Sequence, residues 1–500
     1  MTKENNIIKI LLASGILLFL YSLWHRIPDI DGAWIGENAY WLAKTGFAKS
    51  ELMRGITSQE TLSVIHHKLF NLIGALSIMI FGFSTYTLKS ISLLFFIILM
   101  ILMNQYSKDP KLSFTKSDRI LLFTLLLFFP WVFKYAFVYR PEIMITSLGF
   151  AAFILLEKVL VEHNKKNSFT WFAGILIGLA MATHLNGIVM AASAVTLLLW
   201  NKQFKLVIPF SIGVLMGFSV YFYDYFGSDY FNFWYYQFFN SPTVKGVHEY
   251  PFWIEPVINL LSEHMRYFHD VKIIVFTVFM LVTFLIGFSY AYRNHKQLTR
   301  FTLLMFLFTG MLTIHDTRKY IILNLPYILF LIVIILKALR EGKITKFRYK
   351  IDAKSAGRAT FILMMIYLLV SFGFDLNYSI KKFNPRQNRE ISLKYAGENI
   401  SETNVVAPLT FIFNEIEYYN HIQGEVCYTE FQKAEPDLKG VKFLEKAESY
   451  GNSLLIITPY YQHLLGIDSF EKGKKYGNFI VKEKNSEHII LVKENGFDKK

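Results

Sequence analysis

The chain contains a succession of apolar runs close to membrane length, and this pattern constrains its fold more than any other feature. A transmembrane helix needs about 20 predominantly apolar residues. We take the first run as a retained span rather than a signal peptide, because no small-x-small cleavage site follows it. The sequence therefore predicts a polytopic α-helical membrane protein with about eleven transmembrane helices, at roughly 7–24, 86–105, 119–136, 142–161, 169–184, 187–200, 205–222, 271–292, 299–314, 319–337 and 358–375.

The composition supports this class and excludes others. Of the 500 residues, 53% are hydrophobic while 18% are still charged, which is typical of a multispan membrane protein with sizeable polar parts. The net charge of +14 does not indicate nucleic-acid binding, because the basic residues fall mostly in short links between apolar runs. The one cysteine, Cys427, excludes an intramolecular disulfide and a multi-cysteine metal site.

The basic links predict the orientation. Lys and Arg are retained on the cytoplasmic side of membrane proteins. Placing every basic link there puts the N-terminus in the cytoplasm and the C-terminus outside. The apolar stretch Leu62 to Phe83 then lies along the outer surface as interfacial helices that carry His66, His67 and Lys68, within a first outer loop of residues 25–86. The links are Lys108 to Arg119, Lys165-Lys166, Lys202 to Lys205, Arg293 to Arg300 and Lys337 to Arg358.

Two further segments complete the predicted organisation. A second large outer segment, 223–270, opens with an aromatic tract that could be an interfacial belt or a platform for a sugar or lipid headgroup. After the membrane domain of residues 1–375, the polar residues 376–500 predict a small extracytoplasmic α/β domain for recognition or support. Its strands are expected at 405–406, 454–457, 479–481 and 488–492, with a helix at 441–449. Whether 169–200 is two helices or one bent helix stays open.

Ionisable groups gather where the predicted spans meet the outer surface. Such groups are costly beside a bilayer, so their position is informative. A carboxylate there can take a proton from an attacking hydroxyl or amine, and cations can stabilise a leaving phosphate. Each group alone could equally be an anchor or a structural ion pair. The candidates are Asp29, Asp31, Glu37, His66, His67, Arg140, Glu142, His184, His248, Arg318, Lys319 and Tyr320.

Several of these residues stand in motifs that resemble the GT-C class of membrane glycosyltransferases, which includes the protein mannosyltransferases and the lipid A aminoarabinose transferase. Asp31 precedes an Ala-x-x-Leu-x-x-x-Gly pattern at Ala39, Leu42 and Gly46. The later motifs follow in the family's order over residues 7–337. They are Phe81-Gly82-Phe83-Ser84, Arg140-Pro141-Glu142, Gly174 to Ala180, and Arg318-Lys319-Tyr320 with Pro326.

The resemblance implies an inverting transfer of a sugar from a polyprenyl-phosphate donor to a lipid, glycan or protein acceptor. By the same resemblance Asp31 would be the catalytic base, Glu142 would help position the acceptor or polarise the site, and late cations such as Arg318 would hold the lipid phosphate. The chain departs from the family pattern at Gly32, where a second acid is common, at His66-His67, where Pro-Pro is usual, and at His184, where Lys is common. These departures leave the acceptor open.

Other functions stay open on the sequence alone. Intramembrane ionisable groups also mark transporters or flippases, although no clear internal repeat is visible. A non-catalytic glycolipid-binding scaffold is a third alternative. The histidines and carboxylates could bind a divalent metal, but they show no short ligand spacing, and no other cofactor is indicated. We expect a multi-pass protein of a bacterial plasma (inner) membrane.

Overall fold

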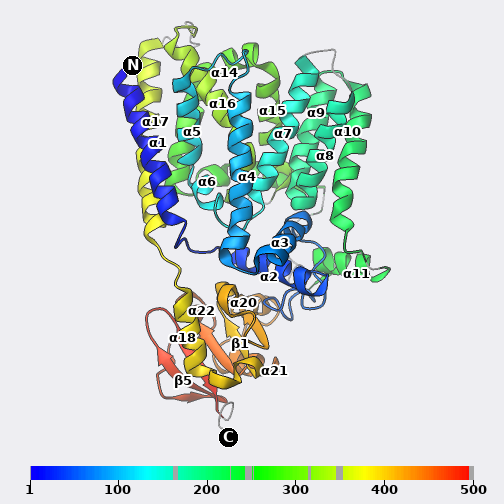
Figure 1. The fold of residues 1–500 in the computed structure, drawn as a ribbon, viewed down its shortest axis with the longest axis vertical. Helices are drawn as coiled ribbons and strands as arrows, with labels where there is room; N and C mark the ends of the chain where they lie inside the picture. The colour runs from blue at the N-terminus through cyan, green and yellow to red at the C-terminus, as the bar shows by residue number, and fades with distance from the viewer. Residues whose placement is uncertain are drawn as a thin grey trace.

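A computed structural model describes residues 2–161, 167–225, 227–241, 251, 253–313, 317–344 and 353–494 of the chain. Its larger part is a helical bundle, and its smaller part is an α/β unit attached to one end of that bundle (Figure 1). The bundle helices are α1 (Thr2–Ser22), α4 (Thr85–Tyr106), α5 (Lys116–Leu127), α6 (Pro130–Tyr135), α7 (Glu142–Val161), α8 (Asn167–Thr183), α9 (Ile188–Trp200), α10 (Phe204–Phe218), α14 (Val271–Asn294), α15 (Lys296–Leu312), α16 (Ile321–Arg340) and α17 (Ala353–Ile380).

A helix occurs at each of the eleven predicted spans. Among the described residues, six helical stretches are long and apolar enough to cross a membrane, so the chain is a multi-pass membrane protein. Helices α1, α8 and α9 are apolar but shorter. The six stretches are Thr85–Tyr106, Glu142–Val161, Phe204–Phe222, Val271–Asn294, Arg318–Arg340 and Ser355–Tyr395.

The predicted span 119–136 is interrupted. Helix α5 ends at Leu127 and α6 begins at Pro130, with Phe128 and Phe129 between them. Proline lacks the amide hydrogen that a continuing helix needs and favours the first position of a new one, so the chain breaks there. The short α6 therefore turns the chain toward the α7 end that carries Glu142.

Residues 169–200 form two helices rather than one bent helix. Helix α8 ends at Thr183, a 3₁₀ turn η1 follows at Leu185–Gly187, and α9 begins at Ile188. Helix α8 packs against α10 through glycines on both sides. A Cβ on Gly174 would lie 2.2 Å from the carbonyl oxygen of Phe210, and a Cβ on Gly178 would lie 2.2 Å from that of Val214. Only small residues allow backbones this close.

Five further helices and three turns lie at the end of the bundle beside the α/β unit. They are α2 (Ile30–Thr45), α3 (Lys68–Phe81), α11 (Asp229–Tyr235), α12 (Glu255–Ser262) and α13 (His264–Tyr267), with the turns η2 (Ser219–Phe222), η3 (Tyr236–Asn240) and η4 (Arg318–Tyr320). In Figure 1, α2, α3 and α11 lie across this end of the bundle, whereas the N-terminus lies at the opposite end. His66 and His67 precede α3 rather than lying on it, because the helix begins at Lys68.

The α/β unit contains a six-stranded mixed sheet with the strand order β2-β1-β3-β6-β5-β4. Strand β1 pairs in parallel with β2 and β3, and β6 is antiparallel to β3 and β5. Strands form at all four predicted positions, but β2 and β4 were not predicted because they are short and carry polar residues. The elements are α18 (Pro385–Tyr395), η5 (Gly397–Glu402), β1 (Asn404–Ala407), η6 (Leu409–Phe411), α19 (Ile412–Glu415), β2 (His421–Gly424), α20 (Val426–Phe431), α21 (Val441–Ser449), β3 (Leu454–Ile457), α22 (Pro459–Leu464), β4 (Lys475–Tyr476), β5 (Phe479–Lys484) and β6 (Ile489–Lys493).

Candidate active site

Asp31 lies in the first turn of α2, at the end of the bundle beside the α/β unit. The preceding Asp29 caps this helix, because its Oδ1 accepts a hydrogen bond from the backbone N–H of Asp31 at 3.2 Å. The Asp31 side chain remains 49% exposed, although that of Asp29 is only 13% exposed. The start of α2 therefore leaves the Asp31 carboxylate half exposed and holds the Asp29 carboxylate in place.

Arg140 connects the carboxylates of this site. Its side chain, only 4% exposed, forms a bidentate ion pair with the fully buried Glu142, with an Nη2 to Oε1 distance of 2.7 Å. Its Nη1 also binds Asp29 Oδ1 at 3.2 Å and contacts Asp31 Oδ2. A planar guanidinium with five donors can bridge several carboxylates in this way.

Two lysines complete the cluster. Lys319, in the turn η4, binds Asp31 Oδ2 at 3.1 Å and lies 3.9 Å from Glu142 Oε1. Lys134, in α6, binds Asp29 Oδ2 at 2.5 Å. We call Asp29, Asp31, Lys134, Arg140, Glu142 and Lys319 the acid–cation cluster. Its three carboxylates and three cations carry no net formal charge.

The cations decide the protonation state of Asp31. Burial alone would raise the pKa of this carboxyl, but Arg140 and Lys319 outweigh burial and lower the pKa to about 2. Asp31 is therefore ionised at neutral pH. Both cations contact Oδ2, so among the described residues Oδ1 has no hydrogen-bond partner.

Three histidines lie beside the acid–cation cluster. The rings of His67 and His184 stack with their centroids 4.8 Å apart, and the His66 ring lies edge-on to Trp34 of α2 at 4.7 Å. His184 Nε2 lies 3.3 Å from the hydroxyl of Tyr320. The fold therefore brings together the predicted residues His66, His67, His184, Tyr320, Lys319, Arg140, Glu142 and Asp31.

The aromatic tract that follows α10 holds in place the loop that carries His66 and His67. The Tyr221 hydroxyl donates to the carbonyl oxygens of Val64 and Ile65 at 3.2 and 3.1 Å. Lys68, at the start of α3, forms a fully buried ion pair with Asp224. The tract thus has a structural use within the fold, while Phe231 and Tyr235 remain exposed, as an interfacial belt requires.

Glu37 stabilises the loop that connects α2 to the α/β unit. Its carboxylate accepts hydrogen bonds from Ser50 Oγ, from the backbone N–H groups of Glu51 and Leu52, and from Trp41 Nε1. Burial nevertheless raises its pKa to about 7. The loop that Glu37 organises binds the sheet edge, because the Leu52 carbonyl accepts from the Gly424 N–H at 2.9 Å. Both oxygens of Glu37 are therefore engaged inside the fold.

The remaining predicted residues lie differently. Arg318 is exposed, and its neighbour Lys319 makes the contact with Asp31. His248 lies outside the described residues. Lys134 was missed because it lies inside an apparent span, although a charge within an apolar run is itself a signal. Within the described parts of the chain, no three His, Cys, Asp or Glu side chains are placed to hold a metal ion.

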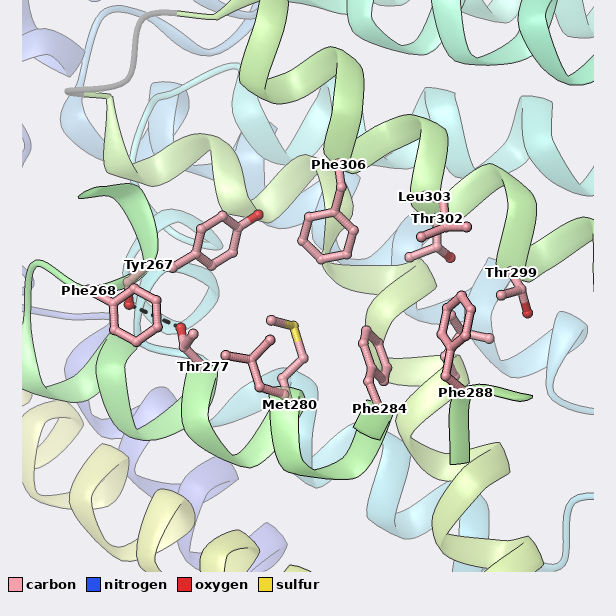
Figure 2. Close-up of a pocket in the computed structure, with 12 residues that line it drawn as sticks. Tyr267, Phe268, Thr277, Met280, Phe284, Phe288, Thr299, Thr302, Leu303 and Phe306 are labelled. Atoms are coloured by element: carbon pink, nitrogen blue, oxygen red, sulfur yellow. Dashed lines mark hydrogen bonds between the residues drawn. The ribbon is translucent and has the colours of Figure 1, made fainter. Parts of the chain in front are cut away.

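An apolar cavity of about 330 Å³ lies between α14 and α15 and reaches α13 (Figure 2). Phenylalanines line it, among them Phe284 and Phe306. Thr277, Thr299 and Thr302 also line it, but their hydroxyls donate to the backbone carbonyls of Tyr267, His295 and Leu298. With these polar groups satisfied, the cavity suits a hydrocarbon chain rather than reacting groups.

Comparison with known proteins agrees with this architecture. The sequence model of glycosyltransferase family 87 matches residues 69–315, just under half of the chain. No curated protein matches the chain in sequence. The match to this family model and the shared fold bear out the resemblance to the GT-C class of membrane glycosyltransferases. They support glycosyltransferase activity rather than the transporter and scaffold alternatives.

Two solved structures show the shared fold. ArnT from Cupriavidus metallidurans bound to undecaprenyl phosphate matches with a TM-score of 0.58 at 12% identity, over 98% of each chain. The oligosaccharyltransferase AglB from Archaeoglobus fulgidus, in complex with an inhibitory peptide and a dolichol-phosphate, matches with a TM-score of 0.52 at 9% identity, over 90% of this chain and 69% of AglB.

Proposed function

We propose that this glycosyltransferase moves a sugar from a polyprenyl-phosphate donor to an acceptor at the extracytoplasmic face, with inversion and with Asp31 as the general base. The observation that carries the proposal is the half-exposed, ionised Asp31 carboxylate held beside Arg140 and Lys319. General-base catalysis needs a carboxylate that can take the proton from the attacking hydroxyl or amine and lies within reach of it. Cations beside it can stabilise the charge that develops on the leaving phosphate.

The cations have two uses in this mechanism. Arg140 and Lys319 hold Asp31 at low basicity, as its pKa of about 2 indicates. An anionic donor phosphate competes for the same positive charges, so its arrival raises the basicity of Asp31 when the base is needed. Glu142 fixes the Arg140 guanidinium through the bidentate pair, and we assign it this positioning role. We assign Glu37 a structural role, in which it stabilises the loop that follows α2.

The apolar cavity is the proposed place for part of the prenyl chain. Tyr267, which lines the cavity, follows the buried Arg266. The Arg266 guanidinium lies 5.9 Å from the ring centroid of Tyr320, next to Lys319. A phosphate at Lys319 would therefore have an apolar site within reach of its lipid chain. The lipid phosphates bound by ArnT and AglB, proteins of the same fold, support this class of donor.

The proposed orientation places the N-terminus in the cytoplasm and the α/β unit, residues 376–500, outside a bacterial plasma membrane. Eleven spans satisfy this orientation. Basic residues occupy the ends of helices opposite the acid–cation cluster, among them Lys205 at α10, Arg293 at α14 and Arg340 at α16. The positive-inside rule retains such residues in the cytoplasm. The acceptor is a lipid, glycan or protein that approaches from the outside.

Purified protein in proteoliposomes tests the function directly. A panel of polyprenyl-phosphate sugars is offered with candidate acceptors, and mass spectrometry follows the release of polyprenyl phosphate and the formation of glycosylated product. We expect acceptor-dependent release for one sugar class and the opposite anomeric configuration in the product. Retention of the donor's anomeric configuration would contradict the single displacement at Asp31. Movement of intact donor across the vesicle without release would contradict the proposal as a whole.

A further inference from the structure

His67 and His184 form a stacked imidazole pair from two distant parts of the chain. His67 precedes α3, and His184 lies at the break between α8 and α9. His184 Nδ1 accepts a hydrogen bond from the Asn186 N–H at 3.0 Å, so in the neutral ring the proton lies on Nε2, toward the Tyr320 hydroxyl. The pair is therefore oriented by its surroundings before any ligand arrives.

His67 is held in an unfavourable state. Its backbone adopts the left-handed region with φ 46°, which is uncommon for a residue other than glycine. The side chain is more than nine-tenths buried, and its Nδ1 has no hydrogen-bond partner among the described residues. A buried polar atom without a partner costs stability, so the geometry favours a bound group that supplies one.

Burial and the neighbouring charges keep the His67 imidazole neutral. Burial and then the neighbouring His184, His66, Arg140 and Lys319 hold its pKa well below the usual value of 6.5. The groups that face the pair are the cations Arg140 and Lys319, the acid Glu142, and the neutral His66, Tyr320 and Trp34. A negative charge added close to Arg140 and Lys319 would favour the protonated form of His67.

The proposed reaction supplies that charge. The acceptor oxygen or nitrogen forms a bond to the sugar carbon, the bond from that carbon to the phosphate oxygen breaks, and the electron pair stays on the phosphate. The acceptor's proton goes to Asp31. The donor is a phosphodiester with one negative charge, whereas the product is a monoester with a second pKa of about 6 and nearly two negative charges at neutral pH.

We propose that His67, stacked on His184, takes up a proton as the leaving phosphate gains its second negative charge, and then donates Nδ1–H to that phosphate. The inference rests on the proposed function. It makes His67 a charge-compensating residue that distinguishes the lipid monophosphate product from the diester donor. Binding of the product is therefore coupled to proton uptake, with bulk water as the proton source in a binding experiment.

Calorimetry on the full-length protein in detergent tests this coupling. Farnesyl phosphate is the monoester probe and its methyl ester is the diester probe. Titrations at pH 7.5 in two buffers of different ionisation enthalpy give the number of protons taken up. We expect about one proton per bound monoester and almost none per bound diester, with a monoester Kd that rises about tenfold per pH unit between pH 7 and 8.

Two variants assign the proton. His67→Asn places an amide near the Nδ1 position and tolerates the left-handed backbone, so it should remove the proton uptake and the pH dependence of the Kd. His66→Asn is the matched control and should retain both. Proton uptake that persists in His67→Asn would refute the assignment, and so would equal uptake for monoester and diester in the unaltered protein.

The failures of the two proposals are distinguishable. Binding of the monoester without proton uptake would overturn the role of His67 while leaving the glycosyltransferase mechanism at Asp31 intact. If neither probe binds to the folded protein, the assignment of the phosphate site is wrong and both proposals fail.

Discussion

The ion pair between Arg140 and Glu142 should couple the stability of the bundle to the acid–cation cluster. The Glu142 side chain is fully buried and that of Arg140 is 4% exposed. Without Arg140, Glu142 keeps only Lys319 at 3.9 Å, whereas without Glu142, Arg140 keeps both Asp29 and Asp31. Breaking a buried pair costs about 3–5 kcal/mol, whereas replacing both partners by apolar residues is often nearly neutral. Arg140→Met should therefore destabilise the protein by about 3–5 kcal/mol. Glu142→Met should destabilise it by less, because Arg140 retains two carboxylate partners.

The double variant separates this explanation from simple loss of packing. With both charges removed, Asp29 still has Lys134 and Asp31 still has Lys319. We therefore expect the double variant to cost clearly less than the sum of the two single variants. Urea unfolding of the detergent-solubilised protein, followed by far-UV circular dichroism, gives the three changes in the free energy of unfolding.

An exposed ion pair provides the control for this double-mutant cycle. Lys394 and Glu483 are 62% and 27% exposed and 2.7 Å apart, and solvent screens such exposed pairs so that they contribute little to stability. Lys394→Met should therefore change the free energy of unfolding far less than Arg140→Met does. If the Arg140 and Glu142 effects add to within about 0.5 kcal/mol, the buried pair is not energetically coupled and the reasoning is refuted.

Three further predictions concern other parts of the fold. Gly174→Val should lower the thermal midpoint of the solubilised protein by far more than Gly357→Val, because a Cβ at Gly174 would lie 2.2 Å from a backbone oxygen of α10, whereas nothing lies within 4 Å at Gly357; equal midpoints would contradict the close helix contact. Because Glu37 has a folded-state pKa of about 7, above its unfolded value, its protonated form is favoured by folding. Stability should therefore fall by roughly 3 kcal/mol as pH rises from about 4.5 to 7, and Glu37→Gln should remove this slope; a slope that persists would contradict the assignment. Leu303→Trp, which fills the apolar cavity, should weaken binding of undecaprenyl phosphate at least tenfold relative to farnesyl phosphate, measured by calorimetry; equal losses for both lipids would contradict the proposed prenyl site.

The sequence predicted the helical class and the polar end of the bundle for clear physical reasons. Apolar runs near membrane length and the distribution of Lys and Arg between them are one-dimensional signals, so each predicted span coincides with a helix. The break at Pro130 was readable in the same way but was not used. The two glycine pairs of α8 and α10 show their purpose only when the helices are packed together.

The composition of the acid–cation cluster depended on long-range contacts that no local pattern reveals. Asp31 and Lys319 are 288 residues apart, and Lys134 reaches Asp29 over 105 residues. The sequence placed the late cation at the right turn but favoured Arg318, since only the direction of each side chain from η4 selects Lys319. Glu37 was grouped with Asp31 by proximity in sequence, whereas the helix directs it to the loop that binds the α/β unit.

The role of Asp31 as the general base is tested most directly by the turnover of Asp31→Asn in proteoliposomes with a competent donor and acceptor. Asp229→Asn in α11 is the matched control, because Asp229 is an exposed carboxylate at the same end of the bundle. We predict that Asp31→Asn lowers kcat about 10²–10⁴-fold while the Kd for farnesyl phosphate does not rise, and that Asp229→Asn leaves both unchanged. A kcat for Asp31→Asn within tenfold of the unaltered enzyme would contradict the account.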